Sequence, residues 1–226
     1  MKKGTVTEKS QLTRSNILQS ALELFREKGF TNTTMRNIAE KAEMALGSAY
    51  YYFRTKDEIV LAYYAETQQE SNEQNKKIIA ESTDFRKRLN ALLTFKFIQM
   101  KDDRQMVGVL AKSAADPDNP LSPFSPNTKD IRLASIKLIE DVINGSNIQV
   151  AKEVKPQLPR ALWLYQMGLI FYWIHDKSPN QTMTFKFKDL SLDILIRLMK
   201  LSSLPLMKQI NEPLIQLIKN YQICTD

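Results

Sequence analysis

Residues 33–56, TTMRNIAEKAEMALGSAYYYFRTK, contain the signals for two short helices joined by a tight turn. Thr34 is a good N-cap, so the first helix can begin at Met35. The apolar residues that follow share one face at helical spacing and can pack inward: Ile38, Ala39 and Ala42. After a turn at residues 43–45, residues 46–49 carry no long charged side chain, so the second helix can approach a duplex closely. This pattern predicts a helix-turn-helix, whose second helix lies in the DNA major groove.

Several side chains of this stretch are candidates for contacts with DNA. Successive residues on a helix point about 100° apart, so the three tyrosines at positions 50–52 cannot all be buried, and an exposed phenol can bond a phosphate. Lys56 stands at the start of the next helix, where the helix dipole disfavours a cation, and a phosphate contact would explain it. We therefore predict that the DNA-binding residues are Thr34, Arg36, Leu46, Gly47, Ser48, Tyr50, Tyr51, Tyr52 and Lys56.

The same stretch resembles a known family. Residues 47–59, GSAYYYFRTKDEI, look like the recognition helix and following turn of tetracycline-repressor-like (TetR) transcriptional regulators, and residues 21–34 resemble that family's first helix. The resemblance covers roughly residues 10 to 65. It implies an all-α fold, with an N-terminal three-helix DNA-binding module followed by a larger helical domain for effector binding and dimerisation. It also implies a ligand-responsive repressor that binds a palindromic operator in double-stranded DNA as a homodimer.

Three positions depart from the family pattern. Glu43 stands where the family usually has glycine, and a left-handed conformation costs a non-glycine residue about 1 kcal/mol. Either the turn is built differently or the rest of the fold bears that cost. Ala45 replaces the usual serine cap, and Leu46 replaces a frequently basic or polar residue that faces DNA. Because Leu46 cannot donate a hydrogen bond, its partner at a base would be a thymine methyl group, and operator preference cannot be taken over from relatives.

The composition of the chain limits its class. The 226 residues allow one large or two small domains, and 32 basic against 25 acidic residues give a net charge of +7, which suits nucleic acid but is weak evidence alone. The single cysteine, Cys224, excludes an intrachain disulfide, and we interpret it as an inert thiol rather than a redox sensor. Without a signal peptide or an apolar run long enough for a membrane span, we expect a soluble, cytoplasmic protein with no membrane partner.

The sequence divides into four parts. We expect a flexible tail at residues 1–9, although Lys2, Lys3 and Lys9 could instead form a basic arm that contacts phosphates. The DNA-binding domain follows at residues 10–58, with its first helix at 13–28 ended by Gly29. Residues 59–77 form the connection, in which the run 66–77 (ETQQESNEQNKK) has no apolar residue. That run is either a solvated helix or a flexible linker, and we favour a helix because no glycine or proline interrupts it.

Residues 78–226 form the effector-binding and dimerisation domain. We expect its helices at 85–100 (after Asp84 as a cap), 106–115, 131–143, 161–175, 189–204 and from Pro213 onward, with a proline-rich loop at 116–127. The helix at 161–175 is apolar on all sides, so it is covered either within the monomer or by a second copy. Together with the helix at 189–204 it can build a symmetric four-helix interface, and we predict a homodimer through these two helices.

A small-molecule site in this domain is a better candidate than a catalytic site. Aromatic and thioether side chains there can line a cavity for a small apolar effector, and the predicted lining residues are Phe97, Met100, Met106, Phe124, Trp163, Met167 and Phe171. The alternative for each of them is ordinary core packing. An effector in this domain is what the family resemblance implies.

Catalysis has little support in the sequence. One histidine and one cysteine provide neither a zinc site nor a nucleophile pair, and no glycine-rich phosphate loop is present. We interpret His175 as structural, and the acid pairs Asp102–Asp103 and Asp116/Asp118 as solvated. The sequence therefore predicts no enzyme activity, no cofactor and no metal. A helical adaptor or ligand-sequestering protein with an idle helix-turn-helix is the alternative to a regulator.

Overall fold

In a computed structural model, the regular secondary structure of the described residues is entirely helical. Those residues are 8–114, 116, 118–202 and 204, together with 209, 212, 213 and 216. The α-helices are α1 (Glu8–Lys28), α2 (Met35–Lys41), α3 (Leu46–Tyr52), α4 (Lys56–Glu81), α5 (Phe85–Met100), α6 (Arg104–Ser113), α7 (Lys129–Ile143), α8 (Leu158–His175) and α9 (Thr182–Leu201). Short 3-10 turns precede four of them: η1 (Lys101–Asp103), η2 (Pro126–Thr128), η3 (Lys155–Gln157) and η4 (Pro179–Gln181).

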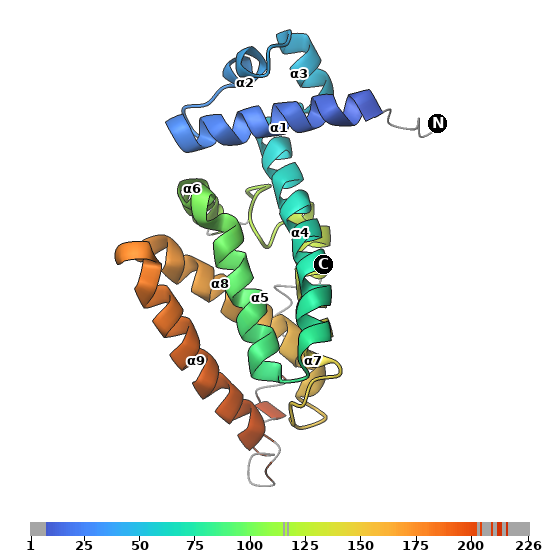
Figure 1. The fold of residues 1–226 in the computed structure, drawn as a ribbon, viewed down its shortest axis with the longest axis vertical. Helices are drawn as coiled ribbons and strands as arrows, with labels where there is room; N and C mark the ends of the chain where they lie inside the picture. Colours follow the sequence, from blue (N-terminus) through green and yellow to red (C-terminus); the bar gives the residue numbers. More distant parts are fainter. Residues whose placement is uncertain are drawn as a thin grey trace.

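The first three helices form a small module at one end of the molecule. In Figure 1, α1 lies across the upper end of α4, with α2 and α3 above it. Its core is apolar and includes Ile17, Leu18, Phe25, Ile38, Ala49, Phe53 and Ile59, each at most 1% exposed. Helix α1 begins at Glu8 rather than at residue 13, so Lys9 is helical and not part of a tail, while Lys2 and Lys3 lie outside the described residues. Gly29, at φ +80°, ends α1 in the left-handed conformation that glycine allows.

Helix α4 is the connection between the module and the rest of the molecule. Its 26 residues continue without a break past Ile78, so the same helix belongs to both parts (Figure 1). The polar run 66–77 is helical, but the expectation that it is solvated is wrong for one of its faces. Gln68, Ser71 and Asn75 are 6%, 0% and 2% exposed. Their partners come from the neighbouring helices: Ser135 Oγ donates to Gln68 Oε1 (2.8 Å), and Asn75 Nδ2 donates to the Leu138 carbonyl (3.2 Å).

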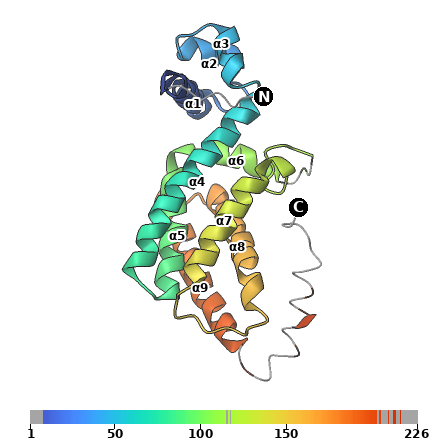
Figure 2. The ribbon, with the colours of Figure 1, turned by 90° about the vertical axis from the view of Figure 1, so that its right-hand side faces the viewer.

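In the second domain, α5 and α7 pack against the lower part of α4, while α8 packs on α7 and α9 packs on α5 and α8. Figure 2 shows α7 between α4 and α8, and all three pairs of neighbours α4/α5, α4/α7 and α7/α8 are in contact. The largest side chains of its core come from α5 and α8, among them Phe85, Leu89, Leu92, Trp163 and Trp173. Asp84 caps α5 as expected, because its carboxylate accepts from the Lys87 amide at 2.8 Å.

Several helix ends in this domain differ from expectation. Helices α6, α7 and α8 begin two or three residues earlier than predicted, and α9 begins at Thr182 instead of residue 189. The early start of α9 has a tertiary cause: the Asp176 carboxylate, at the end of α8, accepts hydrogen bonds from both the amide and the hydroxyl of Thr184 (2.8 and 2.7 Å). Burial alone would raise the pKa of Asp176, but the hydrogen bonds from Ser178 and Thr184 outweigh it and hold the pKa well below its usual value.

The predicted C-terminal features fall largely outside the described residues. The last expected helix includes Leu214, Ile215, Leu217 and Ile218, none of which the structure describes, and the same is true of Cys224. No helix in the described part of the chain combines the length and the apolar character that a membrane span needs.

Candidate functional site

The first helix of the predicted DNA-reading pair is fixed by a reciprocal cap. The Asn37 amide donates to Thr34 Oγ1 (3.2 Å), and the Thr34 amide donates to Asn37 Oδ1 (3.1 Å). The inward residues of α2 are buried as expected, and Arg36 is exposed on its outer side. Because Thr34 Oγ1 also donates to Asn37 Oδ1 (2.9 Å), the hydroxyl of Thr34 already has partners within the protein. A contact between Thr34 and DNA stays a prediction.

The turn between α2 and α3 keeps a left-handed residue although glycine is missing. Glu43 has φ +56°, so the chain takes the strained conformation and the surrounding structure bears its cost. Hydrogen bonds hold the turn, among them those from the Met44 amide to the Ala39 carbonyl (3.0 Å) and from Asn16 Nδ2 on α1 to the Ala42 carbonyl (3.1 Å). Ala45 is the N-cap of α3 and forms no side-chain cap, as its sequence predicts.

Helix α3 offers its outer face to solvent. Ala49 and Phe53, 0% and 1% exposed, fix its inner side on the module core. Of the predicted contact residues on α3, Gly47, Ser48, Tyr50 and Tyr51 are exposed, with 82% exposure for Tyr51. Leu46 and Tyr52 are half-buried and pack partly against the core. The exposed residues form one surface at the beginning and outer side of a short, firmly seated helix, which is the arrangement that entry into a major groove requires.

Lys56 has a partner inside the protein that the sequence did not indicate. Its ammonium donates to the Phe30 carbonyl at 2.6 Å and lies 4.5 Å from the centre of the Phe30 ring. Burial lowers the pKa of Lys56, and Asp57 opposes that shift. These contacts tie the beginning of the α1–α2 loop to the start of α4, so no phosphate is needed to explain a cation there. A phosphate contact of Lys56 stays a prediction.

A polar chain centred on the buried Asp103 joins the module to the second domain. Arg26 Nε on α1 contacts Asp103 Oδ1 at 2.7 Å, and the Tyr63 hydroxyl on α4 donates to Asp103 Oδ2 at 2.7 Å. Asp103 is 4% exposed, so the expectation that it is solvated is wrong, whereas Asp102, Asp116 and Asp118 are exposed as expected. Burial and the bond to Asp103 raise the pKa of Tyr63, which keeps the phenol protonated as a donor.

Below this link lies a cavity of about 200 Å³ between α4, α5, α6, α7 and α8. Five of the seven residues predicted for an effector site line it: Met100, Phe124, Trp163, Met167 and Phe171. Two do not. Phe97 is packed against Trp173 and Phe185, with ring centroids 5.8 Å from each, and Met106 is 2% exposed in the core of the N-terminal module. Both were apolar at helical spacing, a pattern that does not distinguish a cavity wall from a core.

The cavity wall also contains polar side chains that the sequence analysis missed. They are Tyr63, Tyr64, Thr67, Gln68, Lys96, Gln99, Thr128, Arg132, Ser135 and Gln166. One signal could have found part of this set: Gln166 lies within the most apolar helix of the chain, and it is 4% exposed. A polar residue in such a helix needs a polar neighbour or a ligand.

The outer face of α8 and α9 carries exposed apolar side chains. Those of α9 recur every three or four residues along one side, and the whole set is Leu164, Phe171, Tyr172, Met183, Phe187, Leu190, Ile194, Leu198 and Leu201, each at least 38% exposed. We call it the α8–α9 face. Exposed apolar surface of this extent marks an interaction site, and it lies on the two helices predicted to form a dimer.

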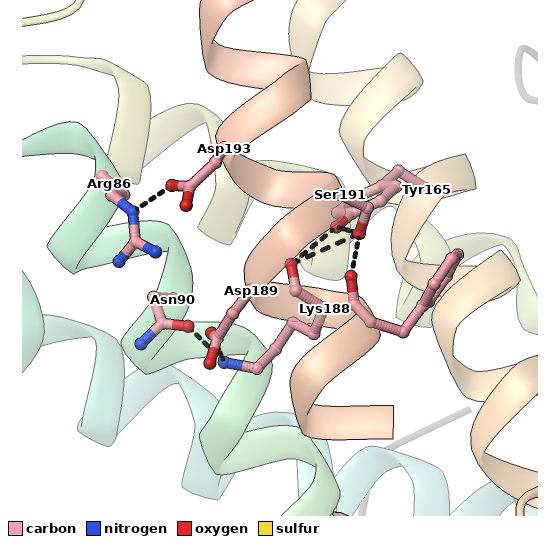
Figure 3. A network of polar contacts seen from close by, with 8 residues as sticks. Arg86, Asn90, Tyr165, Lys188, Asp189, Ser191 and Asp193 are labelled. Atoms are coloured by element: carbon pink, nitrogen blue, oxygen red, sulfur yellow. Dashed lines mark hydrogen bonds and ion pairs between the residues drawn. The ribbon is translucent and has the colours of Figure 1, made fainter. Parts of the chain in front are cut away.

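A polar network holds α9 in place behind the α8–α9 face. Figure 3 shows Arg86 on α5 paired with Asp193 (2.5 Å), and Lys188 bonded to Asn90 and to Asp189 (2.8 Å). On the other side, the hydroxyls of Tyr165 and Ser191 are 2.6 Å apart and join α8 to α9 (Figure 3). Side-chain contacts therefore hold α9, which carries most of the α8–α9 face, against α5 and α8.

Comparison with known proteins gives two family matches. Residues 17–63 match the family described as bacterial regulatory proteins, tetR family, and residues 88–213 match the tetracyclin repressor-like C-terminal domain. The HTH-type transcriptional regulator TtgR of Pseudomonas putida is 38% identical over 55 residues, which are 24% of this chain and 26% of that protein. The HTH-type transcriptional repressor KstR2 of Rhodococcus jostii is 33% identical over 81 residues, 36% of this chain and 40% of that protein. The matches thus span about a quarter to two fifths of these relatives.

Solved structures share the fold over nearly their whole length. The TetR-family repressor FadR of Thermus thermophilus, solved with lauroyl-CoA, superposes with a TM-score of 0.62 at 18% identity, covering 84% of this chain and 95% of that one. A TetR regulator from Haloarcula marismortui gives a TM-score of 0.64 at 17% identity, covering 84% and 98%. The fatty acid degradation regulator FadR of Bacillus halodurans gives 0.63 at 18% identity, covering 85% and 96%.

Proposed function

The chain belongs to the tetR family of bacterial regulatory proteins, which makes it a DNA-binding transcription regulator and not an enzyme, and we propose that it is a homodimeric repressor released from a palindromic operator by a small molecule. The observation that carries this proposal is the exposed outer side of α3, with Ser48, Tyr50 and Tyr51 presented from a core in which Ala49 and Phe53 are buried. The alternative of an adaptor with an idle helix-turn-helix loses its main support, because Glu43 takes the left-handed conformation that such a turn needs.

DNA reading would be divided among the exposed side chains. Ser48 and Gly47, at the start of α3, would meet base edges, while Arg36, Tyr50 and Tyr51 would meet the backbone on either side; all five are exposed. Leu46 and Tyr52 are half-buried, and their exposed atoms would belong to the same surface. Thr34 and Lys56 would add contacts through whichever donors are not used within the protein. Lys56 retains two further N–H groups beside the one that bonds Phe30.

Dimerisation would cover the α8–α9 face. In a two-fold dimer each subunit places the same two helices against their copies, which removes nine large exposed apolar side chains per subunit from water. The dimer would set the distance between the two copies of α3, and a palindromic operator would match that symmetry. Phe171 belongs to both the cavity wall and the α8–α9 face, so a ligand in the cavity adjoins the dimer contact.

Release by a ligand would act through α4. Tyr63 lines the cavity and also bonds Asp103, which pairs with Arg26 of the DNA-binding module. A ligand that binds better to one orientation of α4 would shift the module by its differential affinity for the two states. The Thermus thermophilus relative was solved in complex with lauroyl-CoA, which supports a ligand-responsive regulator.

DNA flanking the protein's own coding region, searched for an inverted repeat, provides the probe for a test by fluorescence anisotropy. Tyr51→Ala should weaken binding about tenfold for all sequences, because a backbone contact is lost, whereas Ser48→Ala should change the preference among operator variants. Leu133→Ala, an exposed leucine of α7, is the control and should bind like the wild type. Equal behaviour of all three variants across an operator library would refute the proposed reading surface.

A second test addresses the dimer. Leu190→Glu together with Ile194→Glu places charges in the middle of the α8–α9 face, so the variant should be monomeric by light scattering and should lose operator binding. Leu133→Glu makes the same change at an exposed leucine away from that face and should remain dimeric. A dimeric double variant would show that the α8–α9 face is not the interface.

A further inference from the structure

The cavity contains cations and no acid. Among the described residues that line it, Lys96 and Arg132 are basic, and none is an aspartate or a glutamate. Both basic residues are buried, with 9% and 3% of their surface exposed. The rest of the wall is largely apolar and aromatic. A cavity with this composition attracts a negative charge and at the same time offers an apolar surface for a molecule's body.

Lys96 has little hydrogen bonding within the chain. In the described structure its ammonium donates to Gln99 Oε1, at the long distance of 3.4 Å, although it carries three N–H groups. The Gln99 amide cannot turn to improve this, because its Nε2 donates to the Thr67 carbonyl (2.9 Å) and to Glu70 Oε2 (2.8 Å). Gln99 thus stands between Lys96 and Glu70, whose side chain is exposed at the surface.

The other buried cations of the described chain show how unusual this is. Lys188, 2% exposed, bonds both Asn90 and the Asp189 carboxylate. Arg88, 4% exposed, donates to the Ile79 and Asn144 carbonyls at 2.9 and 3.1 Å. Arg132 donates to the Pro123 and Ser125 carbonyls (2.9 and 3.2 Å) and so holds the proline-rich loop that closes one side of the cavity.

Keeping a weakly paired ammonium in such a place costs stability. Burial lowers the pKa of Lys96 to about 8, with Glu70 opposing the shift, so the charged form still predominates near neutral pH. An acceptor that brought its own negative charge into the cavity would satisfy the free N–H groups and remove much of that cost. Lys96 lies beside Met100 on α5 and faces a wall that includes Trp163 and Met167.

We propose that the effector is a small amphipathic monocarboxylate, whose carboxylate accepts hydrogen bonds from Lys96 Nζ while its apolar body lies against Met100, Phe124, Trp163 and Met167. This inference rests on the proposed function, because it names the ligand class of the same site. Arg132 already donates to backbone carbonyls, so Lys96 is the one weakly bonded cation of the described wall, and it suits a monoanion rather than a phosphate, for which several cations are usual. The volume of about 200 Å³ suits one short chain or one ring system.

Calorimetric titration with three probes of matched length tests the ligand class: decanoate, decanol and decylamine, with 4-phenylbutyrate as a ring-containing carboxylate. The wild-type dimer should bind at least one of the two carboxylates roughly tenfold or more tightly than decanol, and decylamine most weakly. Lys96→Met keeps the apolar stem and removes the charge, so it should lose the preference for carboxylate over alcohol. Lys87→Met, an exposed lysine of the same helix, should behave like the wild type.

The proposal would be overturned if the wild type bound decanol as tightly as the carboxylates or more tightly, or bound neither carboxylate up to millimolar concentration. It would also be overturned if Lys96→Met kept the preference for carboxylate over alcohol. A ligand-free measurement is independent of the choice of probe. Lys96→Met should melt at a higher temperature than the wild type, since a buried, weakly paired charge is removed, and a lower melting temperature would show that the ammonium is satisfied within the chain.

Operator binding of the same samples separates this inference from the proposed function. If the ligand-free wild type and Lys96→Met both bind the inverted repeat but no carboxylate preference is seen, the ligand class is wrong and the regulator stands. If carboxylate binding depends on Lys96 and yet does not weaken operator binding, the ligand class is right and release by that ligand is wrong.

Discussion

The two halves of the molecule bury different kinds of side chain. In the N-terminal module, the large residues packed between α1, α2, α3 and the beginning of α4 are apolar and almost fully buried. In the second domain, the surfaces of α4, α5 and α7 that face the cavity bury polar side chains, among them Gln68, Lys96 and Arg132. The module thus uses its interior to hold α3 in one orientation. The second domain keeps interior volume and hydrogen-bonding groups that another molecule can use.

The largest expected effect tests this contrast directly. Phe53→Ala removes a ring that is 1% exposed in the module core, and it should lower the free energy of unfolding by about 3–5 kcal/mol. Met167→Ala, in the cavity wall, should cost less than about 2 kcal/mol, because its side chain already borders open volume on one side. Chemical denaturation followed by circular dichroism measures both. Similar losses for the two variants would mean that the halves do not differ in packing.

A second prediction concerns the junction between the halves. Asp103→Asn removes the charge that pairs with Arg26 and accepts from Tyr63, so the free energy of unfolding should fall by about 1–3 kcal/mol. The neighbouring change Asp102→Asn affects an exposed side chain and should stay within about 0.5 kcal/mol. If Asp103→Asn also leaves operator binding intact but makes it insensitive to effector, the junction transmits the ligand signal. An unaltered response to effector would place the signal elsewhere on α4.

The smallest expected effect concerns strain within the module. Glu43→Gly relieves the left-handed conformation at φ +56°, so it should raise the free energy of unfolding by about 1 kcal/mol. Glu40→Gly, an exposed position inside α2, should lower it by about 1 kcal/mol, because glycine is a poor helix former. Thermal melts of the two variants should therefore shift in opposite directions. A destabilised Glu43→Gly would show that the glutamate side chain itself holds the turn.

Local signals account for what could be predicted. The cap at Thr34, the inward face of α2 and the helical nature of residues 66–77 depend on neighbours within a few positions along the chain, and the structure confirms them. The start of α9 could not be predicted in the same way, because it depends on Asp176 reaching across a turn to Thr184. Asp103 was expected to be solvated for a related reason: Arg26 and Tyr63 are its partners only after folding.

The candidate site was predicted in part. Five of the seven expected wall residues line the cavity, since aromatic and thioether groups are common in such walls. Phe97 and Met106 have the same chemistry and the same spacing, yet they lie in closed cores. Lys96 was not predicted at all, because a lysine in an amphipathic helix is ordinarily on its solvated side.

The amino-acid sequence was sufficient to predict the helix-turn-helix, its family, the helical nature of the described part of the chain and the apolar character of α8 and α9. These features follow from capping, periodicity and composition, which act over one or two helical turns. Packing of the helices was needed to bury a polar face of α4, to join Arg26 to Tyr63 through Asp103, and to place Lys96 at a cavity whose described lining holds no acid. These are properties of side chains that meet across different helices, and their burial and pairing are set when the helices pack together.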